Sequence, residues 1–368
     1  MNSLRDLQKL GQSIWLDYLR RDLITSGRLK KMMEEDGVTG MTSNPTIFQK
    51  AISEGTEYDD LIRSLLRDSA SDAATLFEEI EVSDIRLAAD VLRPVYDRTN
   101  GADGFVSIEV NPHLAYNSVG SISEARRLWH EVGRPNLMVK IPATVEGLPP
   151  IEQLTSEGIN VNITLIFSVS QYDDVVQAFL RGLRQAHDPQ RITSVASFFV
   201  SRVDSAVDKA LEEVGTEDAL ALRGKAGIAN AKLAYSRFQE IFYGEEFQNL
   251  QSRGARIQKP LWASTSTKNR NYSDVMYIEG LAGRDTVNSM PPETLESFRD
   301  HGKATPALTK DTAEAEEVIE KLLAMEINLR SIGMDLTEQG VEKFEKSYDD
   351  LLRTLDGKRE NLLKKTAA

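Results

Sequence analysis

Asn136-Leu-Met-Val-Lys-Ile-Pro-Ala-Thr144 is an apolar run that is interrupted by one charged residue, Lys140. A short run of this kind is typical of a buried strand. Similar apolar or alternating runs recur along the chain, and longer segments with helical periodicity separate them. The predicted strands cover residues 13–17, 38–44, 104–110, 137–143, 161–167, 192–199, 261–265 and 285–290.

The alternation of strands and helices predicts an α/β fold with parallel strands and crossover helices. Eight such units favour a closed (β/α)8 barrel, the TIM barrel, over an open doubly wound sheet. The open Rossmann arrangement would require a G-x-G-x-x-G turn after the first strand, and the sequence has none there. We therefore predict one barrel domain over residues 1–368, with residues 311–368 as a helical extension that packs on the barrel.

Three helices within the barrel are indicated by their periodicity. Residues 84–98 and 217–243 each have the pattern of one helix, and Ser170 is expected to cap another. In the extension, apolar residues at helical spacing predict one long amphipathic helix or two. These apolar residues are Val341, Phe344, Tyr348, Leu351, Leu352 and Leu355. A stripe of this kind indicates packing on the protein core.

The composition excludes several kinds of site. The chain has no Cys, and its 4 His residues lie far apart, at His113, His130, His187 and His301. Thiol nucleophiles, disulfides and iron–sulfur clusters are therefore excluded, and a metal site built on imidazole is not expected. Neither a metal nor a bound cofactor is indicated.

The charge balance bears on the partners of the protein. The chain has 57 acidic and 44 basic side chains, and a formal net charge of −13 opposes non-specific binding to nucleic acid. No run reaches the roughly 18 apolar residues that a membrane span requires, and the N-terminal residues lack the apolar stretch of a signal peptide. We expect a cytoplasmic protein with neither a nucleic-acid nor a membrane partner. An anionic substrate would require cations gathered locally within this acidic chain.

Lys140 is the sharpest chemical feature of the sequence. Burial of an ammonium is costly and lowers the pKa of a lysine, and a neutral amine is the form that attacks a ketone to give a Schiff base. The alternative is a lysine that reaches water at the strand end or pairs with a carboxylate. Lys140 alone does not decide between these interpretations.

Other strands carry polar residues where a parallel strand is usually apolar. These residues are Asp17, Glu109, Asn162, Thr164 and Ser197. Asn162 and Thr164 lie two residues apart and point to the same side of their strand, which can be the barrel interior. Asp17 could instead begin a helix, and Glu109 could lie at the rim. Several polar positions beside an apolar-strand lysine together indicate a site.

Three segments at strand ends have both a structural and a functional interpretation. Asn44 before Pro45 has the pattern of a helix N-cap followed by the first helical residue. The polar loop after the seventh strand contains Ser264 and Lys268, which could hold a phosphate. Arg202 could bind a phosphate through two hydrogen bonds or be an ordinary surface arginine.

Taken in order, these segments resemble the transaldolase family of class I, Schiff-base aldol enzymes. The resemblance runs from about residue 11 to near residue 300. Its motifs are Gly40-Met-Thr-Ser-Asn-Pro-Thr46, Gly104-Phe-Val-Ser-Ile-Glu-Val110, Met138-Val-Lys-Ile-Pro-Ala-Thr144 and Gly158-Ile-Asn-Val-Asn-Ile-Thr-Leu-Ile-Phe167. Their order and separation carry the resemblance more than any one of them.

The resemblance implies an activity and roles for the residues that match. It implies reversible transfer of a dihydroxyacetone unit from sedoheptulose 7-phosphate to glyceraldehyde 3-phosphate, in the non-oxidative pentose phosphate pathway. The Schiff-base lysine would be Lys140 and the acid/base aspartate Asp17, while Glu109 and Thr164 would hold a proton-shuttling water. Residues that match those contacting the sugar or supporting the site are Thr42, Asn44, Asn162, Ser197, Phe199 and Arg202. No metal or cofactor is implied.

The phosphate loop departs from the pattern of the family. Many members carry Ala-Ser-x-Arg after the seventh strand, whereas Ala263-Ser-Thr-Ser266 places a serine at the arginine position. Ser264 matches the family, and Lys268 is a possible substitute for the arginine.

Three other functions remain as alternatives. A simple aldolase would release free dihydroxyacetone, but relatives of that kind typically carry Gln and Tyr where this chain has Glu109 and Phe199. A sugar-phosphate-binding barrel without turnover would have no use for an amine at Lys140. A metal-dependent aldolase or isomerase would require clustered His and carboxylate ligands. The sequence leaves open whether the protein is a monomer or a homodimer and which acceptor aldose it prefers.

Overall fold

The computed structural model describes residues 2–68 and 72–366 of the chain. Its centre is a closed barrel in which all eight strands pair in parallel in sequence order, with β8 pairing back to β1. The strands are β1 (Gln12–Asp17), β2 (Val38–Thr42), β3 (Val106–Glu109), β4 (Leu137–Pro142), β5 (Val161–Ile166), β6 (Ser194–Phe199), β7 (Gln258–Ala263) and β8 (Thr286–Met290). The predicted (β/α)8 class is confirmed.

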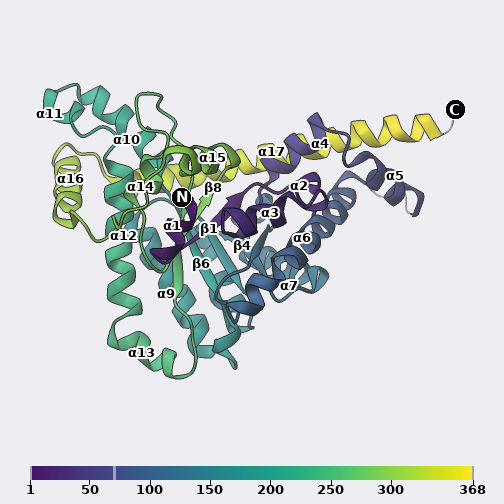
Figure 1. Cartoon of the computed structure of the whole chain (residues 1–368), viewed down its shortest axis with the longest axis horizontal. Helices are drawn as coiled ribbons and strands as arrows, with labels where there is room; N and C mark the ends of the chain where they lie inside the picture. The colour runs from purple at the N-terminus through teal and green to yellow at the C-terminus, as the bar shows by residue number, and fades with distance from the viewer. Residues whose placement is uncertain (1, 69–71, 367–368) are drawn as a thin grey trace.

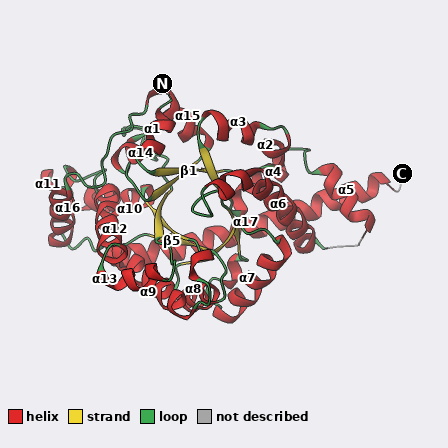
Figure 2. Cartoon of the chain, turned by 60° about the horizontal axis from the view of Figure 1, so that its bottom comes forward, coloured by secondary structure: helices red, strands yellow, loops and turns green. Residues whose placement is uncertain are grey.

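Helices surround the barrel, as Figure 2 shows around the central strands. They are α1 (Ser3–Lys9), α2 (Arg21–Thr25), α3 (Arg28–Glu35), α4 (Pro45–Glu54), α5 (Asp59–Asp68), α6 (Ala73–Arg98), α7 (Ser118–Val132), α8 (Leu148–Ser156), α9 (Val169–Gln185), α10 (Ser201–Val214), α11 (Glu217–Leu220), α12 (Ala226–Phe242), α13 (Glu245–Ser252), α14 (Met276–Gly280), α15 (Pro292–His301), α16 (Thr312–Ala324) and α17 (Leu329–Thr366). In the described part of the chain, no helix is long and apolar enough to cross a membrane.

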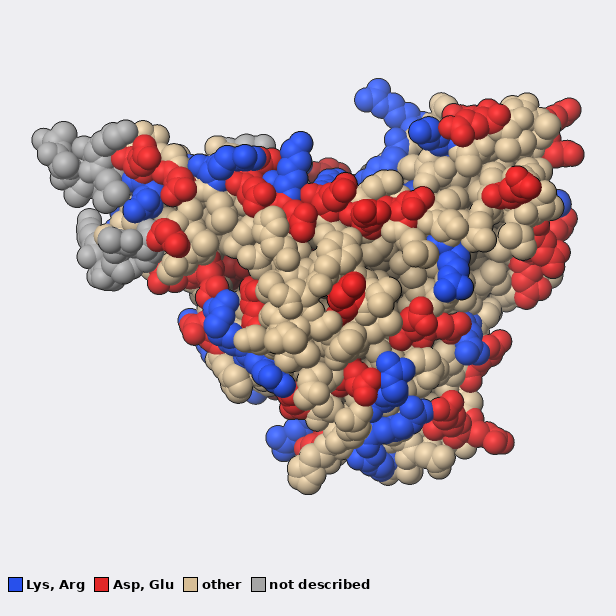
Figure 3. Space-filling view, turned by 180° about the vertical axis from the view of Figure 1, so that it is seen from behind, with Lys and Arg blue, Asp and Glu red and all other residues tan. Residues whose placement is uncertain are grey.

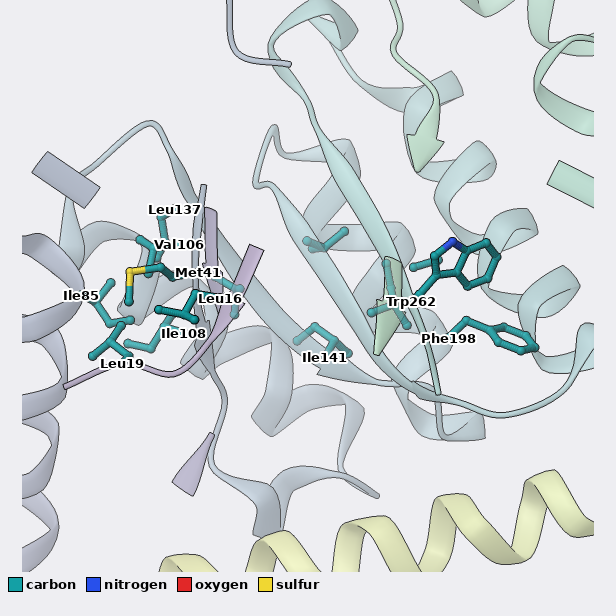
Figure 4. Packing of buried hydrophobic residues seen from close by; sticks show 14 of the residues in the cluster. Leu16, Leu19, Met41, Ile85, Val106, Ile108, Leu137, Ile141, Phe198 and Trp262 are labelled. Atoms are coloured by element: carbon teal, nitrogen blue, oxygen red, sulfur yellow. The ribbon is translucent and has the colours of Figure 1, made fainter. Parts of the chain in front are cut away.

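The alternation of side chains along each strand separates two cores. On β4, Leu137, Val139 and Ile141 face outward into the main core, between the barrel and its helices, whereas Met138 and Lys140 face the interior. Figure 4 shows Val106 and Ile108 of β3 packed near Ile85 of α6 in this outer core. Toward the amino ends of the strands, the interior is filled by apolar side chains, namely Trp15, Met138, Val195, Leu261 and Val287. The polar strand residues lie nearer the carboxyl ends of the strands.

The extension after residue 311 contains two helices, α16 and α17. The long helix α17 packs against α4, α6 and α10, and Figure 1 shows it running along one side of the molecule, past α4 and α5. Of the predicted stripe, Leu351 and Leu355 belong to the outer core, whereas Val341 and Phe344 join the inner cluster. The stripe therefore serves two different cores.

Three helix predictions differ from the structure in detail. The helix predicted over residues 84–98 begins eleven residues earlier, at Ala73. Ser170 does not cap α9, because Ser168 is its N-cap and accepts a hydrogen bond from the backbone N–H of Gln171. Residues 217–243 do not form one helix. The chain turns between α11 and α12, where Gly224 has a left-handed φ of +73° and its N–H donates to the Asp208 carboxylate at 2.8 Å.

Several strand ends also differ from the prediction. β7 begins three residues before the predicted segment 261–265 and ends at Ala263, because Ser264 has a left-handed φ of 54°, which an extended strand cannot continue through. β2 ends at Thr42, so Asn44 lies outside the strand. β3 is shorter than segment 104–110, since Gly104 has a φ of 91°.

Candidate active site

A cavity of about 550 Å³ opens at the carboxyl ends of the strands. Ten of the twelve site residues predicted from the sequence line it, namely Asp17, Thr42, Asn44, Lys140, Thr164, Ser197, Phe199, Arg202, Ser264 and Lys268. This end of the barrel is where TIM-barrel enzymes place their active sites. Because strand side chains alternate, each of these strand residues shares the interior face with the apolar layer beneath it.

Lys140 lies on the wall of this cavity and is 5% exposed. Its Nζ donates hydrogen bonds to the backbone carbonyl of Ser43 at 3.1 Å and to Oε2 of Glu109 at 3.2 Å. The strand register explains the second contact, because Glu109 of β3 lies directly opposite Lys140 of β4. The predicted alternative of a lysine paired with a carboxylate therefore holds, and the pair is buried inside the barrel.

Glu109 and Asn162 do not line this cavity but support it from behind. Asn162 is completely buried, donates to Oγ of Ser107 at 2.9 Å, and accepts from Oγ of Ser197 at 2.6 Å. Burial raises the pKa of Glu109, and the positive charge of Lys140 opposes that shift. Neither residue is at the rim of the barrel.

Asp17 is at the end of β1, on the same cavity as Lys140. Oγ1 of Thr42 donates to its Oδ1 at 2.7 Å, and the same hydroxyl lies 2.9 Å from Oγ of Ser289. Burial raises the pKa of Asp17, while the Thr42 hydrogen bond and then the charges of Lys140, Lys268 and Arg202 act in the opposite direction. Asp17 does not begin a helix, since α2 begins at Arg21.

Besides Lys140, Lys50 and the ion-paired Arg20, three cations line the cavity, and within the described residues none of these three forms an ion pair. They are Arg202 of α10, Lys268 after β7 and Lys343 of α17. The guanidinium of Arg202 lies 5.5 Å from the ring centre of Phe199, and Nζ of Lys268 donates to Oγ of Ser266 at 2.6 Å. Burial, followed by the charge of Arg202, lowers the pKa of both Lys268 and Lys343. An anion bound among these cations would relieve their repulsion.

The strand-end loops hold their polar residues by local structure. Asn44 is the N-cap of α4, and its Oδ1 accepts from the Ile47 N–H at 3.2 Å, so the predicted capping role is confirmed. Ser264 keeps its Oγ 2.9 Å from Oγ of Ser201. Both residues nevertheless line the cavity.

Among the cavity-lining residues that sequence analysis did not assign to the site, Ser289, Lys343 and Phe344 contact or flank the predicted residues. Ser289 is on β8 and its Oγ lies 2.9 Å from Oγ1 of Thr42, and the polar residues Thr286, Asn288 and Ser289 in this buried strand were a usable signal. The ring centre of Phe344 lies 5.7 Å from Nζ of Lys140. No sequence signal identified Phe344 or Lys343, because their helix was interpreted only as a packing surface.

The described residues contain no group of three or more His, Cys, Asp or Glu side chains arranged to hold a metal ion. The face of the molecule in Figure 3 carries acidic and basic side chains intermixed, without the broad basic surface that binds nucleic acid. The cations of the site are thus a local feature.

Comparison with known proteins places this geometry in a family. The transaldolase of Thiobacillus denitrificans is 48% identical over 357 residues, covering 96% of this chain and 99% of that protein. The transaldolase of Mycolicibacterium smegmatis is 47% identical over 360 residues, covering 96% and 97%. Transaldolase 2 of Nostoc punctiforme is 45% identical over 372 residues, covering 97% of each. A family model described as transaldolase/fructose-6-phosphate aldolase matches residues 14–355. The chain therefore belongs to the transaldolase/fructose-6-phosphate aldolase family.

Proposed function

We propose that this enzyme is a transaldolase that carries a dihydroxyacetone unit from a ketose phosphate to an aldose phosphate as a Schiff base on Lys140. The observation that carries the assignment is a buried amine that opens onto a cavity with a carboxylate on each side: Glu109 behind it and Asp17 across the cavity mouth. A protein that only binds sugar phosphates has no need of this amine, because burying a charged group is costly.

The first stage is formation of the Schiff base. The ammonium of Lys140 passes a proton to Glu109, whose Oε2 it already contacts at 3.2 Å. The free amine adds to the ketone carbonyl to give a carbinolamine. Glu109 then returns the proton to the carbinolamine hydroxyl, which leaves as water. The result is a positively charged iminium and an ionised Glu109, so the charge of the pair is the same before and after this stage.

The second stage is cleavage of the bond between C3 and C4. Asp17 takes the proton of the C4 hydroxyl, the aldose leaves as an aldehyde, and the electron pair of the broken bond neutralises the iminium to an enamine. An acceptor aldehyde reverses these steps and receives the proton from Asp17. Since burial raises the pKa of Asp17, this carboxylate is a stronger base for the C4 hydroxyl proton than an exposed aspartate.

Two groups of residues are assigned to the substrate. Thr42, Asn44 and Ser197 reach the cavity where the three-carbon unit would be, and Asn162 orients Ser197 from behind. Arg202, Lys268 and Lys343 are assigned to the phosphate, with the serines of the loop after β7. These residues supply the local positive charge that an anionic substrate requires in a chain of net charge −13.

Transfer requires that the enamine persists until an aldehyde binds and is not first protonated by water. The side chain next to Arg202 on the cavity wall is Phe199, which is 9% exposed and packs against the ring of Phe167 at 5.1 Å. A phenyl ring cannot deliver a proton, whereas a tyrosine hydroxyl could. Glu109 and Phe199 therefore favour a transferase over an aldolase that releases dihydroxyacetone.

The proposal is tested by trapping and by exchange. Fructose 6-phosphate with borohydride should leave a reduced three-carbon adduct on Lys140, identified by peptide mass. Sedoheptulose 7-phosphate with glyceraldehyde 3-phosphate should give erythrose 4-phosphate in the presence of a chelator. An adduct on another residue, or exchange that stops when metal is removed, would overturn the assignment. Release of free dihydroxyacetone as the main product would indicate the aldolase instead.

A further inference from the structure

A second, smaller cavity of about 30 Å³ lies behind Glu109, on the side away from the substrate. Four carboxylates share its wall with apolar and polar groups from α6, β3, α7 and α17. The lining includes Glu78, Glu81, Glu109, Asn111, Glu124 and Tyr348. A space of this size with several polar partners is sufficient for a water molecule.

Three of these carboxylates have partners. Glu109 pairs with Lys140, Glu78 pairs with Arg127, and Glu124 accepts a hydrogen bond from the Asn111 N–H at 3.2 Å. Glu81 is different. It is 8% exposed, and among the residues that the structure describes it has neither a hydrogen-bond partner nor an ion-pair partner.

An ionised carboxylate in this position would be expensive, because nothing offsets its lost hydration. Burial, followed by the negative charges of Glu109, Glu124 and Glu78, raises the pKa of Glu81 well above its ordinary value. This shift favours the neutral form of the Glu81 carboxyl, which has one O–H to donate. The cavity that it shares with Glu109 supplies the place for an acceptor.

We propose that Glu81 is a positioning residue for Schiff-base formation: its neutral carboxyl holds a water molecule in the small cavity against the rear of Glu109. The inference rests on the proposed function. The hydrogen bond through water orients the Glu109 carboxylate toward Lys140 while Glu109 takes the ammonium proton and later returns it to the departing hydroxyl. Glu81 neither gains nor loses a proton over the whole step, so the charge balance of Lys140 and Glu109 is undisturbed.

The groups around Glu81 predict how pH acts on this arrangement. It faces Glu78 on its own helix, Glu109 on β3, Glu124 on α7 and Tyr348 on α17, with Lys140 beyond Glu109 and Arg127 paired to Glu78 and Glu124. If Glu81 ionised, a second negative charge would stand beside the pair of Lys140 and Glu109. The ammonium would be held more strongly and its proton would leave more slowly. The rate of Schiff-base formation should therefore fall at alkaline pH as Glu81 ionises, which gives the pH–rate profile an alkaline limb.

The test uses the full chain and the variant Glu81→Gln, which keeps the size of the side chain but cannot ionise. Glu79→Gln is the matched control, because Glu79 is exposed on the same helix. The rate at which fructose 6-phosphate forms the borohydride-trappable adduct is measured across pH, together with KM and the melting temperature. We expect Glu81→Gln, whose amide can still donate to the water, to change the rate of adduct formation at neutral pH by less than about tenfold. We also expect it to lose the alkaline limb at unchanged KM, and Glu81→Asp to recover part of the pH response.

The results separate this inference from the proposed function. A wild-type chain without an adduct on Lys140 would overturn both. An adduct in the wild type combined with an unchanged rate and pH profile in Glu81→Gln would overturn the role of Glu81 alone. A pH-independent loss of rate with a lower melting temperature would do the same. If Glu81→Gln does not fold, carboxyl-carbon NMR of the wild type gives the second test. One glutamate should titrate far above the ordinary range and respond to adduct formation, and absence of such a group would refute the inference.

Discussion

The two ends of the barrel both bury polar side chains, but they treat them differently. At the amino ends of the strands, the amide nitrogen of Asn136 donates to the carbonyls of Ala89 and Gly104, and that of Asn160 donates to those of Pro135 and Leu137. At the carboxyl ends, Arg202, Lys268 and Lys343 face a cavity without an ionic partner in the described chain, and Lys140 has one carboxylate. The first set links backbone segments of the fold to one another, whereas the second set is left available to a ligand.

The difference between the two ends of the barrel shows which observation identifies a functional site. A buried polar residue is not by itself functional, since most such groups are satisfied by backbone atoms. The distinguishing features at the carboxyl ends are charge, a shared cavity, and partners that would have to come from a ligand. At the amino ends of the strands, the side-chain hydrogen bonds stabilise the fold.

The largest effect that would test this comparison is at Lys140. Lys140→Met should reduce turnover by on the order of 10⁴-fold or more, because no other amine in the cavity is buried beside a carboxylate. The melting temperature should fall, because Glu109 stays buried without the ammonium that pairs with it. Steady-state exchange kinetics and thermal unfolding measure the two quantities. Substantial turnover by this variant would show that the carboxyl end does not work through Lys140.

Asp17 gives the next effect. Asp17→Asn should lower kcat by about 10²–10⁴-fold. In the wild type, kcat should fall as pH drops through the pKa of Asp17, which burial raises, because cleavage requires the ionised carboxylate. Thr42→Val removes the hydrogen bond that opposes this shift, so the acid limb should move to higher pH. A limb that stays in place in this variant would contradict the assignment.

The phosphate cations should show a smaller effect that depends on the substrate. Arg202→Gln should lower kcat/KM for fructose 6-phosphate by about 10–100-fold, the worth of a hydrogen bond to a charged group. Lys343→Gln should lower it less, because its side chain is exposed. With unphosphorylated fructose both losses should disappear. Lys346→Gln is the control on the same helix, since Lys346 is exposed and does not line the cavity. Equal losses with both sugars would show that these cations do not act by binding the phosphate.

The smallest effect on activity is expected at the opposite end. Asn136→Ala leaves buried carbonyls without a donor and should lower the free energy of unfolding by about 1–3 kcal/mol. Its kcat at a temperature where the protein remains folded should match that of the wild type. Urea unfolding and exchange kinetics provide the comparison. A large loss of kcat with unchanged stability would mean that the two ends are not divided as described.

Much of the fold could be predicted because period and order are local properties. The runs at 137–143 and 161–167 alternate with helical segments, and eight repetitions leave few topologies other than a closed barrel. The ends of the elements were less predictable. The cap at Ser168, the end of β7 at Ser264 and the turn at Gly224 depend on single backbone conformations that neighbouring residues stabilise.

Lys140, Asp17 and the strand hydroxyls could be recognised in the sequence because a polar residue in an apolar strand is anomalous wherever it occurs. The pairing of Lys140 with Glu109, the isolation of Glu81 and the contribution of Lys343 and Phe344 could not, since these residues come from β3, α6 and α17, far apart in the chain. Which buried group finds a partner is decided only when strands are placed in register and helices are packed on them. The sequence by itself determined the barrel and the lysine within an apolar strand, and the tertiary structure decided which charges remain available to a substrate.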